Sequence, residues 1–365
     1  YTLSLHDALP ISGDFHHKFS ITHYWQGAVG GKNTKNADRI AGLYDFDMCY
    51  LIDAENSDDG MGDYFMAAVS AQSYFGRGVD PKVGSFFDLN DGAKGENGDF
   101  LIDKLFAEFT LADRLITVDI GKIDLVDFFD HSAVANEYKD QFFAYPLVQT
   151  QNIPFSGKGL GVRVQYDPSE SWYLQAAVQD AQADKRETGF NTAFSDEDYY
   201  FGIAEAGIRP NFFGKDGTYR FIVWYDPQDK GYLDGQGGSK RDDMGYAFSF
   251  DQKLTEKVTG FFRYGWADDK VNEVEDFFSF GGQVEGPLEG REKDVFAVGY
   301  AYGLRSPSGL AAGQERQIDL LETYYRIHVN DNISFSPNIQ LVMDPGGEVS
   351  EAPATVFGLR SRITF

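Results

Sequence analysis

Residues 355–365 read TVFGLRSRITF and alternate between two kinds of side chain. One set of positions is apolar: Phe357, Leu359, Ile363 and Phe365. The other set is polar or basic: Arg360, Arg362 and Thr364. Because successive side chains of a strand point to opposite faces, this pattern predicts a strand with one apolar and one charged face. In a soluble sheet the apolar face would cover a core. In an outer-membrane barrel it would meet lipid, and the charged face would line a water-filled lumen.

The rest of the 365-residue chain repeats this alternation. About sixteen stretches look like strands, and no apolar period of 3.6 residues persists beyond a few turns. No uninterrupted apolar run reaches about 18 residues, so no transmembrane helix is predicted. The predicted strands are His17–Val29, Ile40–Ile52, Tyr64–Tyr74, Phe100–Leu111, Leu115–Lys122, Gly159–Tyr166, Trp172–Gln179, Tyr200–Arg209, Tyr219–Asp226, Met244–Phe250, Lys257–Trp266, Phe277–Glu285, Val295–Gly303, Asp319–Val329, Ile333–Val342 and Thr355–Phe365.

The connections between these stretches alternate in length. Counting back from Phe365, the long segment 343–354 precedes the last strand and the short segment 330–332 precedes the strand before it. An up-and-down membrane barrel requires such sorting, whereas a soluble meander has no reason for it. The predicted fold is therefore all-β: a single up-and-down transmembrane β-barrel over residues 13–365. It has about 16 antiparallel strands, short periplasmic turns and long external loops. The alternative, a soluble carbohydrate-binding β-protein, would need a second sheet to cover the apolar strand faces.

The first twelve residues are treated separately. They read YTLSLHDALPIS, which resembles the conceptual translation of a sequencing adapter. We interpret residues 1–12 as an assembly scar that is not part of the fold. His6 and Asp7 are therefore not site candidates, and the signal peptide of an outer-membrane protein would be missing from this chain.

Composition narrows the classes of partner and chemistry. The net charge is −25, which argues against nucleic acid as a partner because phosphate binding needs clustered positive charge. The single cysteine, Cys49, rules out an intramolecular disulfide and is expected to pack as a small hydrophobe. We find no nucleophile elbow, phosphate-binding loop or metalloprotease motif, and expect no catalysis, cofactor or metal. Acidic loops such as 88–92 are expected to be solvated turns, with calcium binding as the alternative.

One long connection, residues 123–158, differs from the others in being rich in apolar and aromatic residues. A loop of this kind is expected to be buried against another part of the molecule. By the strand count it is the third long loop. Its position resembles that of the third loop of general porins, which folds into the lumen and narrows it, so we predict the same for this loop. Its polar candidates for lining the constriction are Asp124, Asp127, Asp130, His131, Asn136 and Glu137. Alternatively, Asp124 or Asp130 caps a short helix inside the loop.

Several motifs resemble one known family. In and after the long loop they are Gly121-Lys122-Ile123-Asp124, Phe128-Phe129-Asp130, Asn136-Glu137, Gln141-Phe142, Asn152-Ile153-Pro154-Phe155 and Gly159-Leu160-Gly161-Val162. Near the end they are Glu322-Thr323-Tyr324-Tyr325-Arg326, Pro337-Asn338-Ile339-Gln340-Leu341-Val342 and Asp344-Pro345-Gly346-Gly347. Together they are similar to the carbohydrate-selective porin family of the OprB type, over roughly residues 119–365.

The resemblance implies a sixteen-stranded outer-membrane barrel through which small sugars, mono- or disaccharides, diffuse passively. Its surroundings would be outer-membrane lipid and lipopolysaccharide. Which sugar is preferred, and whether the protein is a monomer or a homotrimer, stays open. A general, non-selective porin and an outer-membrane barrel enzyme are the alternative functions.

The alternation within each strand also predicts which wall side chains face the lumen. A sugar pore needs hydrogen-bonding groups and aromatic faces, and mixed arginines and carboxylates supply donors and acceptors. The candidates for sugar contact are Glu108, Asp119, Arg163, Gln165, Arg220, Trp224, Arg263, Gln283, Glu322, Tyr324, Arg326, Arg360 and Arg362. The alternative is that the charged side chains form salt-bridge ladders that stiffen the wall. Trp224 and Tyr324 are either sugar-stacking platforms or packing residues.

Overall fold

A computed structural model describes residues 15–31, 37–53, 63–93, 98, 100–194, 199–311, 314–343, 345 and 352–365. The interpretation of residues 1–12 therefore lies outside the described residues. Sixteen long strands form the wall: β1 (Phe15–Gly30), β2 (Asp38–Asp53), β3 (Tyr64–Gly76), β4 (Phe100–Leu111), β5 (Ile116–Ile123), β6 (Gly159–Ser169), β7 (Trp172–Asp180), β8 (Tyr200–Ile208), β10 (Lys215–Asp226), β13 (Asp243–Lys253), β14 (Val258–Ala267), β15 (Val274–Glu285), β16 (Val295–Arg305), β17 (Gln317–Asn330), β18 (Ile333–Met343) and β19 (Ala354–Thr364).

The shorter elements all lie in connections. They are α2 (Asp80–Val83), η1 (Leu125–Asp127), α3 (Tyr145–Val148), α4 (Phe190–Ala193), β9 (Asn211–Phe212), β11 (Lys230–Gly231), β12 (Ser239–Lys240) and η2 (Pro307–Gly309). Within the described ranges, no helix is long and apolar enough to cross a membrane.

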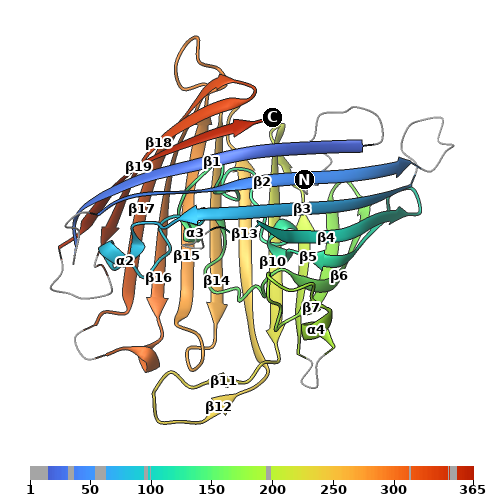
Figure 1. The fold of residues 1–365 in the computed structure, drawn as a ribbon, viewed down its shortest axis with the longest axis horizontal. Coiled ribbons are helices and arrows are strands. Elements are labelled where there is room, and N and C mark those ends of the chain that lie inside the picture. The colour runs from blue at the N-terminus through green and yellow to red at the C-terminus, as the bar shows by residue number, and fades with distance from the viewer. Residues whose placement is uncertain are drawn as a thin grey trace.

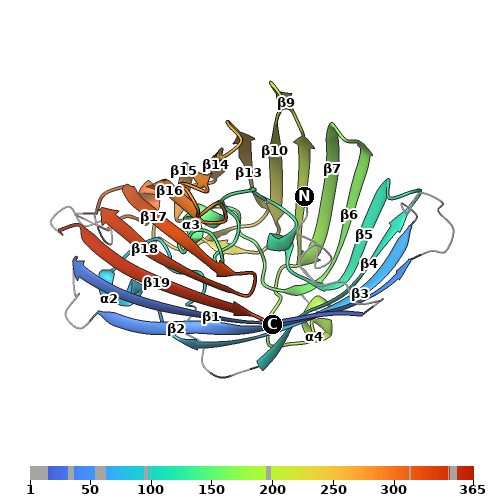
Figure 2. The same ribbon diagram turned by 90° about the horizontal axis from the view of Figure 1, so that it is seen from above.

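The wall strands pair antiparallel in chain order, and the first strand closes the ring (Figures 1 and 2). β1 pairs with β2 along one edge and with β19 along the other, from Ser20 opposite Thr364 to Gly30 opposite Ala354. Each predicted strand corresponds to one wall strand, so the predicted up-and-down barrel is confirmed. Closure leaves no unpaired strand edge, which is the condition for backbone groups to lie in lipid.

The faces of the strands follow the predicted alternation. On β19 the side chains of Phe357 and Leu359 lie on the outside and are 43% and 42% exposed, whereas Arg360 points inward and is 1% exposed. Aromatic rings are concentrated outside β10 and β13–β16, where neighbouring rings such as Tyr246 and Trp266 stack across strands. Apolar outer faces and polar inner faces suit lipid outside and water inside.

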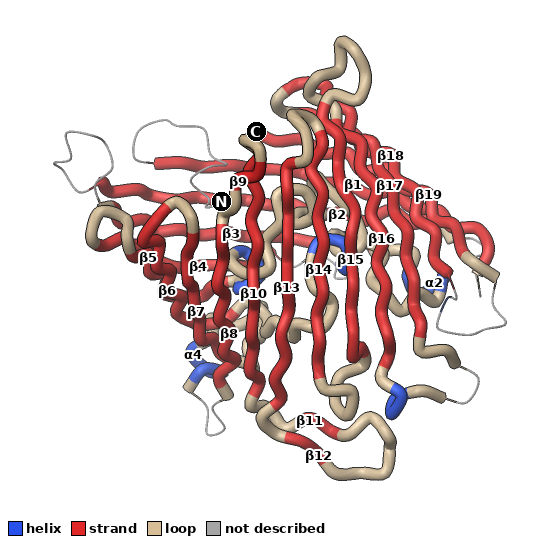
Figure 3. Tube along the Cα trace, turned by 180° about the vertical axis from the view of Figure 1, so that it is seen from behind, coloured by secondary structure: helices blue, strands red, loops and turns tan. Residues whose placement is uncertain are grey.

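The two ends of the barrel differ. Phe19, near the start of β1, and Phe365 exchange backbone hydrogen bonds, so the start of β1 and the last residue lie at the same end of the barrel, which we call the terminal end. The turns 112–115, 170–171 and 331–332 are also there. The long connections 77–99, 124–158, 181–199 and 227–242 start at the opposite end, the loop end, where the β11–β12 hairpin projects in Figure 3.

Two of the long connections fold back into the barrel. We call residues 77–93, the described start of the first of these connections, L2, and residues 124–158 L3; α3, in L3, lies inside the ring of strands in Figure 2. L3 is the predicted third loop, and its location in the lumen confirms that part of the fold prediction. L2 was not predicted to enter. Its segment 88–92 was expected to be a solvated turn, but Leu89, Asn90 and Asp91 are at most 4% exposed.

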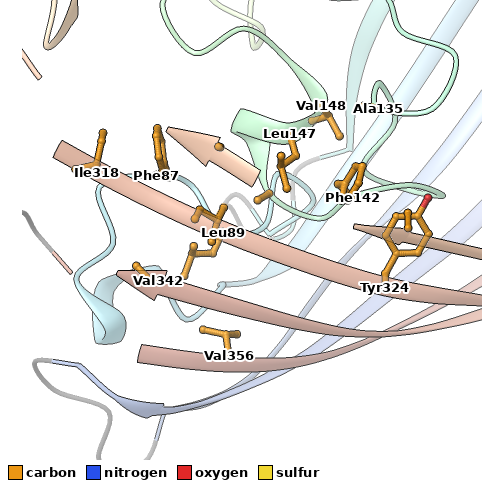
Figure 4. Close-up of a cluster of buried hydrophobic side chains, with 14 of the residues drawn as sticks. Phe87, Leu89, Ala135, Phe142, Leu147, Val148, Ile318, Tyr324, Val342 and Val356 are labelled. Atoms are coloured by element: carbon orange, nitrogen blue, oxygen red, sulfur yellow. The ribbon is translucent and has the colours of Figure 1, made fainter. Parts of the chain in front are cut away.

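The two loops and the wall bury two groups of apolar side chains. The first apolar cluster joins L2 and L3 to β14–β19; it includes Phe87, Leu89, Phe142, Leu147, Tyr324 and Val356 (Figure 4). The second apolar cluster joins the two ends of L3 to β2–β4, β7, β8, β10, β13 and β14; it includes Cys49, Phe106, Leu125, Phe129, Ile153 and Trp224. Burying one large apolar side chain stabilises the folded state by about 1.5–3 kcal/mol. Both loops are therefore packed firmly against the inner wall of the barrel.

Candidate functional site

Arg263, on β14, is the main polar contact between the wall and the middle of L3. Its Nε donates to Oδ1 of Asp130 (3.1 Å), and its two terminal nitrogens donate to the carbonyl oxygens of Asp130, Ala135, Leu147 and Val148. Both side chains of the ion pair are 0% exposed. The planar guanidinium, with five donors, can hold several carbonyls of a folded loop at once. Arg263 therefore fixes the fold of L3 as well as its position.

Glu322, on β17, holds the next part of L3. Oε1 accepts from the backbone N–H of Phe143 (2.7 Å) and Oε2 from that of Ala144 (3.0 Å). The amides of Asn338 and Gln340 on β18 donate to the same carboxylate. A buried carboxylate is tolerated when its lone pairs are satisfied in this way.

Arg360, on β19, holds the segment between these contacts. It donates to the carbonyl oxygens of Tyr138 (2.7 Å) and Gln141 (2.8 Å), and its guanidinium lies over the ring of Phe143. Glu205, on β8, accepts from the backbone N–H of Asp130 (3.1 Å). L3 is thus held by charged side chains from four separate strands.

Glycines in the wall leave room for L3. A Cβ added to Gly265 on β14 would lie 2.1 Å from Oδ1 of Asn152, and one added to Gly299 on β16 would lie 2.9 Å from the ring of Phe142. Both distances are shorter than a van der Waals contact, so L3 packs directly on the strand backbone at these points.

A second set of predicted wall residues pairs within the wall itself. Arg163 donates through Nε to Asp119 (2.7 Å) and through a terminal nitrogen to Gln165 and Gln175, and it stacks on Phe128 of L3. The other pairs in this set are Arg220 with Asp251 (2.6 Å) and Tyr64 with Glu108. The predicted members of this set, Arg163, Asp119, Arg220 and Glu108, lie on the inner face and are at most 5% exposed. Their contacts are those of the salt-bridge alternative.

The two aromatic candidates are packing residues in this structure. Trp224 is 3% exposed and belongs to the second apolar cluster. Tyr324 is 2% exposed and meets the edge of Phe142, with ring centroids 5.2 Å apart. Neither ring presents a free face to the lumen.

The sequence suggested that the aspartates at the start of L3 either line the constriction or cap a short helix, and the structure shows a cap at Asp124 and a part-exposed side chain at Asp127. Asp124 caps η1, since its side chain accepts from the N–H of Val126 (3.2 Å), and Asp127 reaches Lys104 on β4 (2.6 Å). Burial alone would raise the pKa of Asp127, but the Lys104 ammonium and its hydrogen bond hold that pKa below its usual value. Asp127 is therefore a charged group, and its side chain is 37% exposed.

Two pockets open into the lumen, one at each end. The pocket at the loop end has a volume of about 470 Å³ and is lined by Tyr74, Asp103, Asp124, Ser156, Gly157, Lys158, Ala183, Asp184 and Lys185. The pocket at the terminal end has a volume of about 360 Å³ and includes Lys18, Asp140, Arg326, His328 and Arg362 in its lining. Three predicted residues, Asp124, Arg326 and Arg362, thus border open space.

Between the pockets, the inner wall of β1–β4 is polar. Lys18, Asp47, Ser70 and Lys104 are successive cross-strand partners on the four strands. A second row contains Ser20, Asp45 and Gln72, with Asp103 on β4 linked to it through Lys158. We call these eight side chains the polar band. From L3, Lys139 reaches Asp45 (2.9 Å), and Lys158 reaches Asp103 and Asp124.

The sequence reasoning missed the polar band, although part of its signal was visible. Asp45 and Asp47 alternate with Tyr44, Phe46 and Met48, the pattern that identified inward side chains on other strands. The contributions of Lys139 and Lys158 had no local signal, because their partners lie on β2 and β4.

We expect His131 to make the packing of L3 against the wall dependent on pH. Burial, and to a lesser degree Arg220, lowers the pKa of His131 from 6.5 to about 4. The neutral ring therefore stabilises the folded loop fully above about pH 6.5, and this stabilisation is lost as the pH falls toward 4. At about pH 5 we expect the loop to be about 2 kcal/mol less stable than at pH 7.5. Amide-exchange protection factors of L3 at the two pH values measure this, and His131→Gln should remove the dependence. Equal pH dependence in the variant would show that another group is responsible.

Comparison with known proteins places this barrel in a family. The model of the carbohydrate-selective porin, OprB family, matches residues 60–365. Porin AaxA of Chlamydia abortus is 23% identical over 266 residues, which are 70% of this chain and 55% of that protein. The chain thus spans about half the length of the curated relatives that it matches.

Solved structures agree on the fold. A high-pH structure of Pseudomonas putida OprB superposes with a TM-score of 0.82 at 17% identity, covering 96% of this chain and 94% of that one. OmpT of Vibrio cholerae superposes with a TM-score of 0.57 at 12% identity, covering 98% of this chain and all of that one. The family match covers far more than half of the sequence, and the chain therefore belongs to the OprB family of carbohydrate-selective porins.

Proposed function

We propose that the protein is an outer-membrane porin through which small carbohydrates diffuse passively. The observation that carries the proposal is a closed sixteen-strand barrel whose lumen holds a tightly anchored loop. The apolar outer face supports a location in lipid, and membership of the OprB family supports sugars as the solutes. Fold and family indicate a channel rather than an enzyme. In this proposal the terminal end faces the periplasm and the loop end faces outward.

The predicted site residues divide into two groups under this proposal. Sugar contact is assigned to Asp124, Arg326 and Arg362, which line a pocket, and to Asp127, whose side chain is 37% exposed. The fully buried residues, such as Asp130, Arg263 and Glu322, would act on sugar transport by holding L3 at a fixed distance from the wall. Arg163 and Asp119 belong with this second group, since their pair is at most 2% exposed.

Single-channel recording in a planar bilayer tests the function. Purified protein lacking residues 1–12 is expected to form stable open channels, and glucose or maltose should block the current in a saturable manner. Open channels that sugars do not block would indicate a general porin instead. No channels from protein shown to be folded and inserted would contradict the proposal and favour the barrel-enzyme alternative.

A further inference from the structure

Much of the lumen wall is covered by L2 and L3. The first apolar cluster lies against the inner faces of β14–β19, and the second lies against β7, β8, β10, β13 and β14 and against the terminal-end part of β2–β4, at Cys49, Met66 and Phe106. Several charged side chains on these walls, such as Arg263 and Glu322, are 0% exposed under L3, whereas Arg326 and Arg362 line the terminal-end pocket. A dissolved solute cannot reach side chains buried in this way.

The polar band lies between the pockets. Its part-exposed members are Lys18, Asp47 and Lys104, and behind them lie the buried Ser20, Asp45, Ser70, Gln72 and Asp103, which are at most 7% exposed. Lys18, at one end of the band, also lines the terminal-end pocket, and Asp103, at the other end, also lines the loop-end pocket. Barrel strands are tilted, so a row of cross-strand partners also advances along the barrel axis. From Lys18 to Lys104 the row crosses three strand spacings, roughly 14 Å at about 4.8 Å each. The band therefore forms an oblique track from one pocket to the other.

Three lysines along this track, Lys104, Lys139 and Lys158, are paired with carboxylates. Lys104 contacts Asp127 at 2.6 Å, Lys139 contacts Asp45 at 2.9 Å, and Lys158 bridges Asp103 and Asp124. The side chains of these three lysines are 15–19% exposed, so water reaches them although they are engaged. An ion in the track meets no large uncompensated charge, whereas a hydroxyl group finds ammonium donors and carboxylate acceptors in alternation.

We propose that the permeation path runs along the polar band of β1–β4 and that its lysine–carboxylate pairs select uncharged polyhydroxylated solutes over ions. The inference rests on the proposed porin function and goes beyond it by assigning the path to one side of the lumen. It also assigns the solute-binding role to lysines on β4 and L3, which lie outside the set predicted from the alternation of the wall.

The pair formed by Lys104 and Asp127 provides the test, because removing one or the other charge should shift the ion selectivity in opposite directions. Lys104→Met leaves the carboxylate of Asp127 without its partner, so the reversal potential in a KCl gradient should shift toward cation selectivity. Asp127→Asn leaves the ammonium unpaired and should shift it toward anions. The double variant should return close to the wild-type selectivity. In each single variant, block by glucose should weaken by about tenfold, the effect expected for losing one charge-assisted hydrogen bond.

Lys215 supplies a matched control. It forms an ion pair with Glu256 at the terminal end, outside the lumen, so Lys215→Met should change neither selectivity nor glucose block. Circular dichroism and protease resistance establish that each variant is folded.

The outcomes separate this inference from the proposed function. Wild-type channels that glucose blocks, with selectivity and block unchanged in both single variants, would overturn the path along β1–β4 and leave the porin function standing. Folded wild-type protein that forms no channels would overturn both. Shifts of opposite sign that cancel in the double variant would establish the path.

Discussion

Replacing Arg263 with methionine is expected to release L3 from the wall and to raise the single-channel conductance several-fold. The substitution leaves the Asp130 carboxylate buried without its ion-pair partner and removes the donor from the carbonyls of Ala135, Leu147 and Val148. Breaking a buried ion pair by removing one partner typically costs about 3–5 kcal/mol. The wall strands keep their own backbone pairing, so the barrel should still form while the loop loses its seat.

Two measurements check this result. Conductance reports the width of the pore, and amide exchange within 130–150 reports the seating of the loop whether or not the pore conducts. Arg263→Lys is the matched control: it keeps the charge near Asp130 but lacks the fork that reaches several carbonyls, so an intermediate effect is expected. Unchanged conductance together with unchanged protection in the methionine variant would show that L3 does not depend on this contact.

Phe142→Ala should have a comparable effect through packing alone. The ring is 0% exposed, lies against Gly299, and makes edge or tilted contacts with Tyr324 and Phe261. Truncating a buried phenylalanine costs about 3–5 kcal/mol, because the lost transfer energy and the cavity add. We expect exchange protection to fall throughout 134–148 and the conductance to become larger and noisier.

Phe296 offers the control for this prediction. It lies on the outer face of β16, where it is 41% exposed, so Phe296→Ala should leave L3 protection and conductance unchanged. Equal effects of the two substitutions would mean that the barrel, and not the docked loop, responds to the loss of an aromatic ring.

The strands and their faces could be predicted because they depend on local pattern. A period of two residues identifies a strand and also assigns each side chain to a face, as for Leu359 and Arg360. What each inward side chain contacts could not be predicted in the same way. Glu322 binds the backbone of Phe143, 179 residues earlier in the chain, and no local pattern encodes such a contact.

L2 shows where the reasoning from composition was wrong. The polar residues of 88–92 suggested a solvated turn, but Asp88 and Asp91 are part of a backbone connection to L3. Asp91 N–H donates to Phe143 and Tyr145 N–H donates to Asp88. The preceding pair Phe86 and Phe87, with Leu89, was the available signal for burial. Trp224 was predicted either to stack on sugars or to pack against other side chains. In the structure it packs in the second apolar cluster.

The anchors of L3 also set an order of events during folding. L3 lies between β5 and β6, but its partners Arg263, Glu322 and Arg360 follow 115 to 222 residues after the groups that they bind. Closing chain segments of that length is entropically costly until the intervening strands have paired. The loop can therefore reach its seat only after β14, β17 and β19 are in place. The lumen of the newly closed barrel is therefore open at first, and it narrows only when L3 docks in a late step of folding.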